Sequence, residues 1–405
     1  MRLARPGTQA QLEACAARIH ATLMDRDHPL WEVHVIEGLQ SGQVGLYIRV
    51  HHAVLDGAAG MALAGALLDP TPEPRDVPPP RSKRAQAEPP GIVELARAAL
   101  RHDVDQYTKL LRRLPDLVGM LAGAGKRPGD PSAEPARRSR AFGPRTPLNV
   151  SITGERRFAA VSLPLDEVKR VARAHDAKLN DVVLAICSGA LRSYLSRHGG
   201  IPRQPLIAGM PFSLREAGNT DYSTQVTMTL VNLATDIADP VQRLRAIRDA
   251  AGAIKSVAGR AKSLIPTDTP SLGAPWLLGG LAALYERAKV ADRLPPIMNV
   301  VISNIPGPAA PLYAAGARMR TYWPLSIVEH GVGLNITVVS YCGALDFGLV
   351  AARCAVPDVH PLARAIEEAH VELLGLAMKE GERAAPQRGR ASLEPGGHGK
   401  MRRRA

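Results

Sequence analysis

The stretch between residues 44 and 68 predicts a strand, a tight turn and a helix, with two adjacent histidines at the junction. The strand is indicated by apolar residues that alternate with Gly45, Tyr47 and Arg49, namely Val44, Leu46, Ile48 and Val50. The turn is indicated by Asp56-Gly57. The helix is indicated by the spacing of Met61, Leu63, Ala64, Leu67 and Leu68.

Two histidines, His51 and His52, follow this strand directly. Because successive strand side chains point to opposite faces, His52 is expected on the apolar face and His51 on the face of Tyr47 and Arg49. A single histidine on an apolar face is more often a satisfied core residue than a reactive one. The second histidine, and Asp56 four residues after His52, favour a reactive one, since an imidazole with a fixed tautomer can take a proton from an alcohol near neutral pH. A metal site is not expected, because adjacent histidines on a strand diverge.

The composition allows two domains with sizeable cores. The chain has 405 residues, of which 45% are hydrophobic and only 4% aromatic, so the cores must be built from Leu, Val, Ile and Ala. The net charge of +13 has two interpretations: a solvated surface with a basic tail, or attraction to a membrane surface, a phosphate-bearing substrate or nucleic acid. The sequence lacks a basic stripe interleaved with aromatic residues, which is the pattern that would indicate a nucleic-acid partner.

The cysteines and the apolar runs indicate a cytoplasmic protein. Cys15, Cys187, Cys342 and Cys354 are scattered, without metal-ligand spacing, and are expected to be reduced. The sequence shows neither an apolar run of transmembrane length nor a signal-peptide core after Met1. Any membrane contact is therefore expected to be peripheral.

A second strand is predicted just before the first. Trp31, Val33 and Val35 alternate with Glu32, His34 and Ile36, and a turn between Gly38 and Gly42 allows this segment to pair with residues 44–50 as a hairpin. The segment opens with Pro29-Leu30-Trp31-Glu32, and Trp31 is expected to be a core residue near the base of the hairpin.

Two later segments have simple local explanations. Asn180-Asp181 precedes a strongly apolar helix expected over residues 182–195, and either residue can serve as its N-cap. Ser303-Asn304-Ile305-Pro306-Gly307-Pro308 follows a buried strand and indicates a strand-to-loop transition. A further hairpin is predicted for residues 331–341 and 345–350, and a last helix for residues 358–378. Other helices are expected over residues 9–24, 166–174 and 239–257, and other strands over 157–163 and 226–233.

The pattern His-His-x-x-x-Asp-Gly at residues 51–57 resembles the signature of CoA-dependent acyltransferases of the chloramphenicol acetyltransferase type, which condensation domains of peptide synthetases also carry. In those families the second histidine is the general base and the aspartate is structural. The resemblance implies the first role for His52 and the second for Asp56, supported by His51 and Gly57. The motif aspartate often pairs with a distant arginine, for which Arg215 is the candidate here.

The motif, Pro29 to Glu32 and Ser303 to Pro308 together resemble the bacterial wax ester synthase/acyl-CoA:diacylglycerol acyltransferase family, over residues 23–374. The resemblance implies an α/β fold of two chloramphenicol-acetyltransferase-like domains with mixed sheets and an active-site channel between them. An Asn-Asp pair is also a functional motif near the channel in that family. The implied candidates for substrate binding or an oxyanion hole are Asn180, Asp181, Ser303, Asn304, Pro306 and Gly307.

The expected organisation follows from the same resemblance. It comprises an N-terminal domain over residues 1–122 with a Pro-rich loop at 69–90, a linker over 123–153, a C-terminal domain over 154–380 and a disordered basic tail over 381–405. Family members carry a further segment, with an early strand and helix, before the point that corresponds to Met1. An N-terminal domain truncated in this way is expected to expose a sheet edge and part of its core.

The function implied is O-acyl transfer from a long-chain acyl-CoA to diacylglycerol or a long-chain alcohol, which yields triacylglycerol or wax ester. Acyl-CoA is a substrate, and no metal or redox cofactor is expected. The protein is expected at a membrane or lipid-droplet surface on the cytoplasmic side, without a nucleic-acid partner. The alternatives are a condensation-type acyltransferase on a carrier-bound substrate and an inactive homologue that binds lipid surfaces.

The assignment of the base is testable with two alanine variants. His52→Ala should abolish acyl transfer, because general-base help contributes about 10²–10⁴-fold to such reactions. His51→Ala should keep part of the activity if it folds. Acyl transfer by folded protein is the measurement, and equal residual activity in the two variants would remove the reason for choosing His52.

Overall fold

The computed structural model describes residues 1–51, 57–77, 142–213, 226–261 and 274–384, with isolated positions between 91 and 108. The helices are α1 (Gln9–Ala21), α2 (Gly57–Leu67), α4 (Leu165–Ala174), α5 (Leu179–Arg197), α6 (Pro240–Ala261), α7 (Ala274–Arg287), the 3₁₀ helix η1 (Val290–Asp292) and α8 (His360–Ala384). The strands are β1 (Trp31–Ile36), β2 (Gly45–Val50), β3 (Arg156–Pro164), β4 (Ile207–Ser213), β5 (Val226–Asn232), β6 (Val300–Ile305), β7 (Tyr313–Ala314), β8 (Ala317–Arg318), β9 (Leu334–Tyr341) and β10 (Ala344–Ala352).

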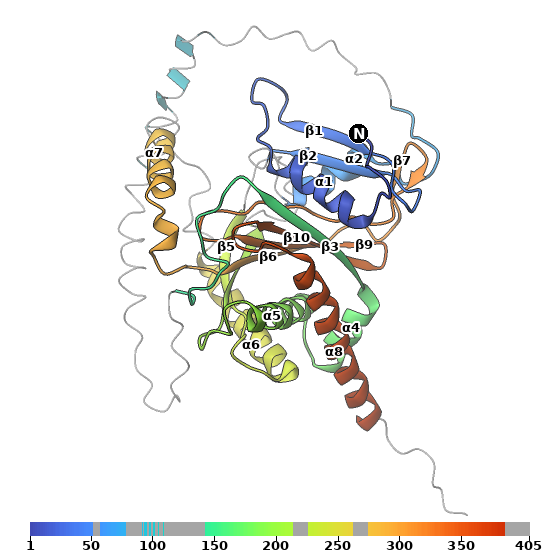
Figure 1. The fold of residues 1–405 in the computed structure, drawn as a ribbon, viewed down its shortest axis with the longest axis vertical. Coiled ribbons are helices and arrows are strands. Elements are labelled where there is room, and N and C mark those ends of the chain that lie inside the picture. The colour runs from blue at the N-terminus through green and yellow to red at the C-terminus, as the bar shows by residue number, and fades with distance from the viewer. Residues whose placement is uncertain are drawn as a thin grey trace, which may run out of the picture.

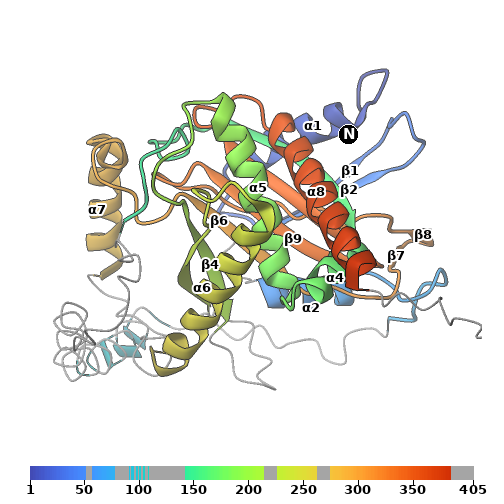
Figure 2. The same cartoon turned by 90° about the horizontal axis from the view of Figure 1, so that it is seen from below.

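A six-stranded mixed sheet in the order β3-β10-β9-β6-β4-β5 forms the centre of the molecule. β6 pairs in parallel with β4 and with β9, while the other neighbours are antiparallel. Helices α4, α5, α6 and α8 cover one face of this sheet (Figures 1 and 2). β1 and β2 form a separate two-stranded sheet, which lies with α1 on the other side. The expected mixed α/β fold is confirmed.

The apolar patterns explain why these elements are buried. α5 carries apolar residues almost all round and is buried from Asp181 to Leu195 except at Gly189, Arg192 and Ser193, as expected of a helix packed on several sides. β9 and β10 are buried on both faces, since helices cover one face and the N-terminal part of the chain lies over the other. The main core joins these elements to Cys15 and Ile19 of α1 and to Tyr47 of β2, so both sheets share one hydrophobic core.

The loop that contains Tyr322 and Pro324 packs against β10, between the large sheet and the N-terminal part of the chain. The buried Asp346 carboxylate accepts hydrogen bonds from the Ser162 hydroxyl at 2.5 Å and from the Tyr322 backbone N–H at 2.6 Å. Burial raises the pKa of Asp346, and these two hydrogen bonds oppose the rise. A Cβ at Gly348 would lie only 1.7 Å from the carbonyl oxygen of Pro324, so only glycine allows this close approach.

Most of the expected elements are confirmed, including the hairpin of β1 and β2 and that of β9 and β10. Trp31 is a correction, because its side chain is 60% exposed rather than part of the core. The N-cap of α5 is another: it is Lys178, whose backbone N–H donates to the Asp181 carboxylate at 2.9 Å. The last helix reaches Ala384 rather than Met378. The expected tail beyond it lies outside the described residues.

The greater part of the expected Pro-rich loop and of the expected linker lies outside the described residues, so the domain boundaries stay a prediction. Cys15 and Cys187 are buried, and all four cysteines are free. Within the described part of the chain, no helix is both long and apolar enough to cross a bilayer.

His360 ties α8 to α1 through carboxylates. Its Nε2 lies 2.9 Å from Glu13 and its Nδ1 2.9 Å from Asp358. A neutral imidazole has one N–H and carboxylates only accept, so both bonds require the imidazolium. Burial disfavours that cation, but the two carboxylates outweigh burial and raise the pKa of His360. The stabilisation is therefore complete below the unfolded-state pKa of about 6.5 and is lost as the pH rises through the raised folded-state pKa.

His360→Gln should lower the free energy of unfolding at about pH 6 by more than at about pH 9, where the wild type has lost the cation. Urea unfolding at the two pH values measures the difference. His28→Gln is the control, because His28 and its partner Asp25 are 75% and 61% exposed and such a pair contributes little. A His360→Gln deficit that does not change with pH would show that the contact is not ionic.

Candidate active site

The structure places a strand and a helix on either side of the histidine motif, as the sequence predicts. β2 ends at Val50 and α2 begins at Gly57. His51 is half-buried, and its backbone N–H donates to the Leu30 carbonyl at 2.9 Å, one residue beyond the last pair of the hairpin. The hydrogen bonding of the hairpin therefore continues into the first residue of the motif.

Three predicted site residues lie outside the described residues: His52, Asp56 and Arg215. The base assignment of His52 and the pairing of Asp56 with Arg215 thus stay predictions. What the structure does describe is how the strand that leads into the motif is held.

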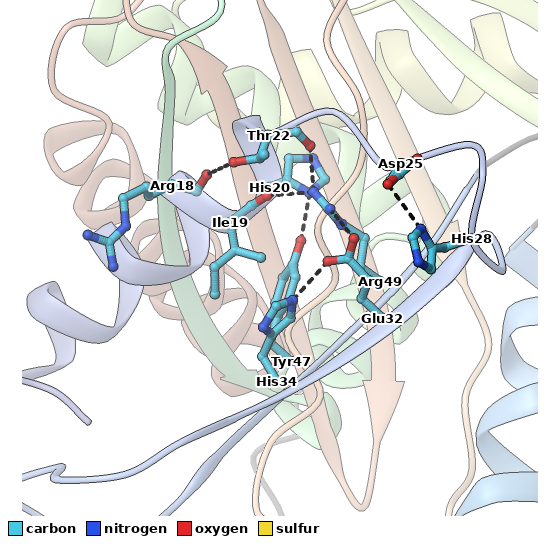
Figure 3. Close-up of polar contacts among 10 residues, drawn as sticks. All are labelled: Arg18, Ile19, His20, Thr22, Asp25, His28, Glu32, His34, Tyr47 and Arg49. Atoms are coloured by element: carbon cyan, nitrogen blue, oxygen red, sulfur yellow. Dashed lines mark hydrogen bonds and ion pairs between the residues drawn. The ribbon is translucent and has the colours of Figure 1, made fainter. Parts of the chain in front are cut away.

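The guanidinium of Arg49 holds the end of β2 against α1. Its Nη1 donates to the carbonyl oxygens of Ile19 and Thr22, each at 2.6 Å, and its Nη2 donates to Glu32 Oε1 at 2.8 Å (Figure 3). The last carbonyls of a helix have no intrahelical partner and carry the negative end of its dipole. A cation that binds them is stabilising, and here the cation belongs to β2, the strand that leads directly into the motif.

Glu32 connects this cation to the neighbouring strand. The hydrogen bond from Arg49 and a second one from His34 at 3.0 Å hold the pKa of Glu32 below its usual value. Glu32 is the last residue of Pro29-Leu30-Trp31-Glu32, and Arg49 lies opposite it in the hairpin. Glu32, the acidic residue of this sequence block, is thus paired with Arg49, which lies two residues before His51.

A neutral imidazole links β2 to the loop over the large sheet. His20 Nε2 lies 2.9 Å from the Ser326 carbonyl, which only accepts, so this nitrogen carries the proton. Its Nδ1 lies 2.9 Å from the Tyr47 hydroxyl and accepts from it. Burial lowers the pKa of His20, with Arg156 and Arg49 adding to the fall, and burial raises the pKa of Tyr47 to about 12. Both groups therefore stay neutral near pH 7.

These contacts turn the polar face of the hairpin inward. Tyr47 and Arg49 are buried, whereas Trp31, Val33 and Leu46 are between 43% and 60% exposed. The apolar side of the alternating pattern is thus the outer side. These two polar side chains can be buried because Tyr47 meets His20 of α1, and Arg49 meets the carbonyls at the end of α1 and Glu32.

The candidates from the second half form two groups. Asp181 is buried and accepts the backbone N–H of the N-cap residue Lys178, and Asn180 is half-buried in the first turn of α5. Ser303 and Asn304 lie at the end of β6 beside β9, where they pair with Thr337 and Val338. Their roles in substrate binding stay predictions.

Gly307 and Pro306 follow directly after β6. The Gly307 N–H donates to the Ser340 hydroxyl at 3.0 Å, and a Cβ at Gly307 would lie 2.3 Å from the Ser340 carbonyl oxygen. Glycine is therefore required for this close packing against the end of β9. The block has at least a structural function, in agreement with the strand-to-loop transition expected from the sequence.

Sequence reasoning did not identify the structural roles of His20, Glu32, Tyr47 and Arg49. For Glu32, Tyr47 and Arg49 the signal was the polar side of the alternating hairpin pattern, whereas His20 lies in α1, outside that pattern. That signal gives two faces without stating which one is buried. The partner of His20, Ser326, is 306 residues away in the chain.

Two family models match the chain in sequence. The wax ester synthase/diacylglycerol acyltransferase catalytic domain matches residues 1–183, and the C-terminal domain of the same family matches residues 222–373. The chain belongs to this family. The predicted family, and with it the prediction of an acyltransferase enzyme, is confirmed.

Curated relatives of the family are similar over most of the chain. A putative diacylglycerol O-acyltransferase of Mycobacterium tuberculosis is 38% identical over 92% of this chain and 80% of its own length. The O-acyltransferase WSD of Acinetobacter baylyi is 35% identical over 90% of this chain and 78% of its own length. The solved wax ester synthase/diacylglycerol acyltransferase of Marinobacter aquaeolei is 31% identical, with a TM-score of 0.63 over 93% of this chain and 78% of that one.

Arg49→Met tests whether the contacts of Arg49 with α1 and Glu32 position β2, the strand that leads into the motif. The variant leaves Glu32 and the Ile19 and Thr22 carbonyls without their cation, so the free energy of unfolding should fall by about 3 kcal/mol. Acyl transfer by folded protein should fall as well. Glu32→Gln should cost only about 1 kcal/mol, since the amide oxygen still accepts from Arg49.

The measurements are urea unfolding and specific activity of the folded fraction. Arg18→Met is the matched control, because it removes an exposed arginine of α1 and should change neither quantity. Full stability and activity in Arg49→Met would show that the contacts of Arg49 do not support the site.

Proposed function

We propose that this protein is an acyl-CoA-dependent O-acyltransferase that transfers a long-chain acyl group to diacylglycerol or to a long-chain alcohol. The observation that carries the proposal is His-His-x-x-x-Asp-Gly between β2 and α2, in a chain matched by both domains of the wax ester synthase/diacylglycerol acyltransferase family. The names of the relatives, diacylglycerol O-acyltransferase and wax ester synthase, support these two acceptors.

In the proposed mechanism His52 is the general base. Its imidazole takes the proton of the acceptor hydroxyl as the oxygen attacks the thioester carbonyl. The new C–O bond forms, the C–S bond breaks, and the proton passes from the imidazolium to the CoA thiolate. The developing oxyanion requires donors, for which the Asn180 side chain and backbone N–H groups at the start of α5 are the candidates.

The reaction balances without an electron acceptor, a metal or a covalent acyl-enzyme. We therefore propose that no metal or redox cofactor takes part. The adjacent histidines support this proposal, because side chains that diverge along a strand are poor ligands for a single ion. The acyl donor and both acceptors are lipids, which supports a location at the cytoplasmic surface of a membrane or lipid droplet.

The test is product analysis with palmitoyl-CoA and each acceptor in detergent micelles, with and without EDTA. We expect triacylglycerol from dipalmitoylglycerol or wax ester from hexadecanol, in equal yield with the chelator. His52→Ala is the control for enzymatic transfer. CoA release that does not require an acceptor would indicate a thioesterase. The absence of product with both acceptors, from folded protein, would support the inactive homologue.

A further inference from the structure

The helix that follows the motif is weak by its own sequence. α2 has 11 residues, among them Gly57, Gly60 and Gly65, and its last turn carries no basic side chain. Glycine is the least favourable helix residue after proline, and isolated helices this short are marginal in water. Between residues 60 and 68, only Ala64 and Leu68 are buried. α2 therefore depends on contacts with other parts of the chain.

The C-terminal end of α2 lacks backbone donors. In an α-helix each carbonyl accepts from the N–H four residues later. For Gly65 that donor would belong to Asp69, but the Asp69 N–H donates to the Tyr313 carbonyl at 2.8 Å instead. For Ala66 it would belong to Pro70, which has no N–H. Both carbonyls therefore need a donor from outside the helix.

Arg75 provides these donors. Its guanidinium donates to carbonyls at the end of α2, namely those of Ala66, of Leu68 at 3.1 Å and of Gly65 at 3.4 Å. Its Nε lies 3.2 Å from the Asp69 carboxylate, which is only 15% exposed and holds the cation in place. A cation at this end of a helix is favoured by the helix dipole. One arginine thus binds the end of α2, as Arg49 binds the end of α1.

The residues after α2 attach it to the second half of the chain, where β7 lies beside the N-terminal part (Figure 1). Asp69 and Tyr313 exchange both backbone hydrogen bonds, each at 2.8 Å, as an isolated antiparallel bridge. Leu68 is buried against Leu312 and Tyr341 in a small cluster separate from the main core. The Tyr341 hydroxyl accepts from the Leu312 N–H at 2.9 Å, which fixes this cluster to β9.

We propose that Asp69 and Arg75 are positioning residues for acyl transfer. α2 begins at Gly57, the last residue of the motif, so fixing its far end fixes the direction in which the chain leaves the motif. Arg49 does the same for the strand that enters the motif. The inference rests on the proposed function and deepens it by adding residues outside the motif. A displacement of about 1 Å in a reacting group can cost about 100-fold in rate.

The test compares Arg75→Met, which removes the cation, with Arg75→Lys, which keeps one. Amide hydrogen exchange in residues 60–68 of Arg75→Met should be about fivefold faster, because the end of α2 opens more easily. The midpoint of urea unfolding should not change, since Arg75 is 41% exposed and lies outside the main core.

Activity is measured in micelles with palmitoyl-CoA and each acceptor. In Arg75→Met, kcat should fall about tenfold with an unchanged KM, because the alignment of the reacting groups is lost while substrate binding is not. Arg75→Lys should recover most of this loss. Adding Asp69→Asn to Arg75→Met should lower kcat little further, because the two side chains act as a pair. Arg353→Met is the matched control and should change none of these quantities, since Arg353 is 50% exposed and pairs with Glu155.

Several outcomes would overturn the proposal. Unchanged exchange or unchanged kcat in Arg75→Met would refute it. A loss of activity that follows a lower unfolding midpoint, and that Arg75→Lys does not restore, would assign a structural role only. A change confined to KM would assign Arg75 to substrate binding. Inactive wild-type protein would refute the proposed function itself, whereas an active wild type with unaffected variants refutes only the positioning role.

Discussion

The buried guanidinium of Arg49 determines how the N-terminal part of this protein is arranged. A charged group can leave water only where other groups replace its hydration. The Ile19 and Thr22 carbonyls at the end of α1, together with Glu32, provide this replacement. Because the side chains of a strand alternate, turning Arg49 inward also turns Tyr47 inward and turns Leu46 and Ile48 outward. One ionic contact thus sets the orientation of the whole hairpin.

The same arrangement explains how the fold serves the motif. The position of the first histidine depends on β2, and β2 is attached on two sides. Arg49 attaches it to α1, and Tyr47 attaches it through His20 to the loop that carries Ser326. Preorganised catalytic groups need such support from residues that do not touch the substrate. The family block that ends in Glu32 is part of that support, whereas the block around Gly307 packs against the end of β9.

Local sequence patterns predicted the helices and strands better than they predicted which residues are buried and which tertiary contacts they make. The β9–β10 hairpin and α5 were predictable, because period-two and continuous apolar patterns are local properties of the chain. The exposure of Trp31 was not, because alternation separates two faces without stating which is buried. In the site, the motif and its flanking strand and helix were predictable, but the contacts of His20 and Arg49 were not. Those contacts depend on residues brought together by the tertiary fold.

The loop that carries Tyr322, Pro324 and Ser326 joins two parts of the chain that are distant in sequence. It is attached to β10 at Asp346 and Gly348, and to α1 at His20. A hinge motion that swung the hairpin away from the large sheet would break either the hydrogen bond of Ser326 with His20 or the contacts of the loop with β10, which include a buried carboxylate. The frame formed by the two sheets is thus expected to stay rigid during turnover.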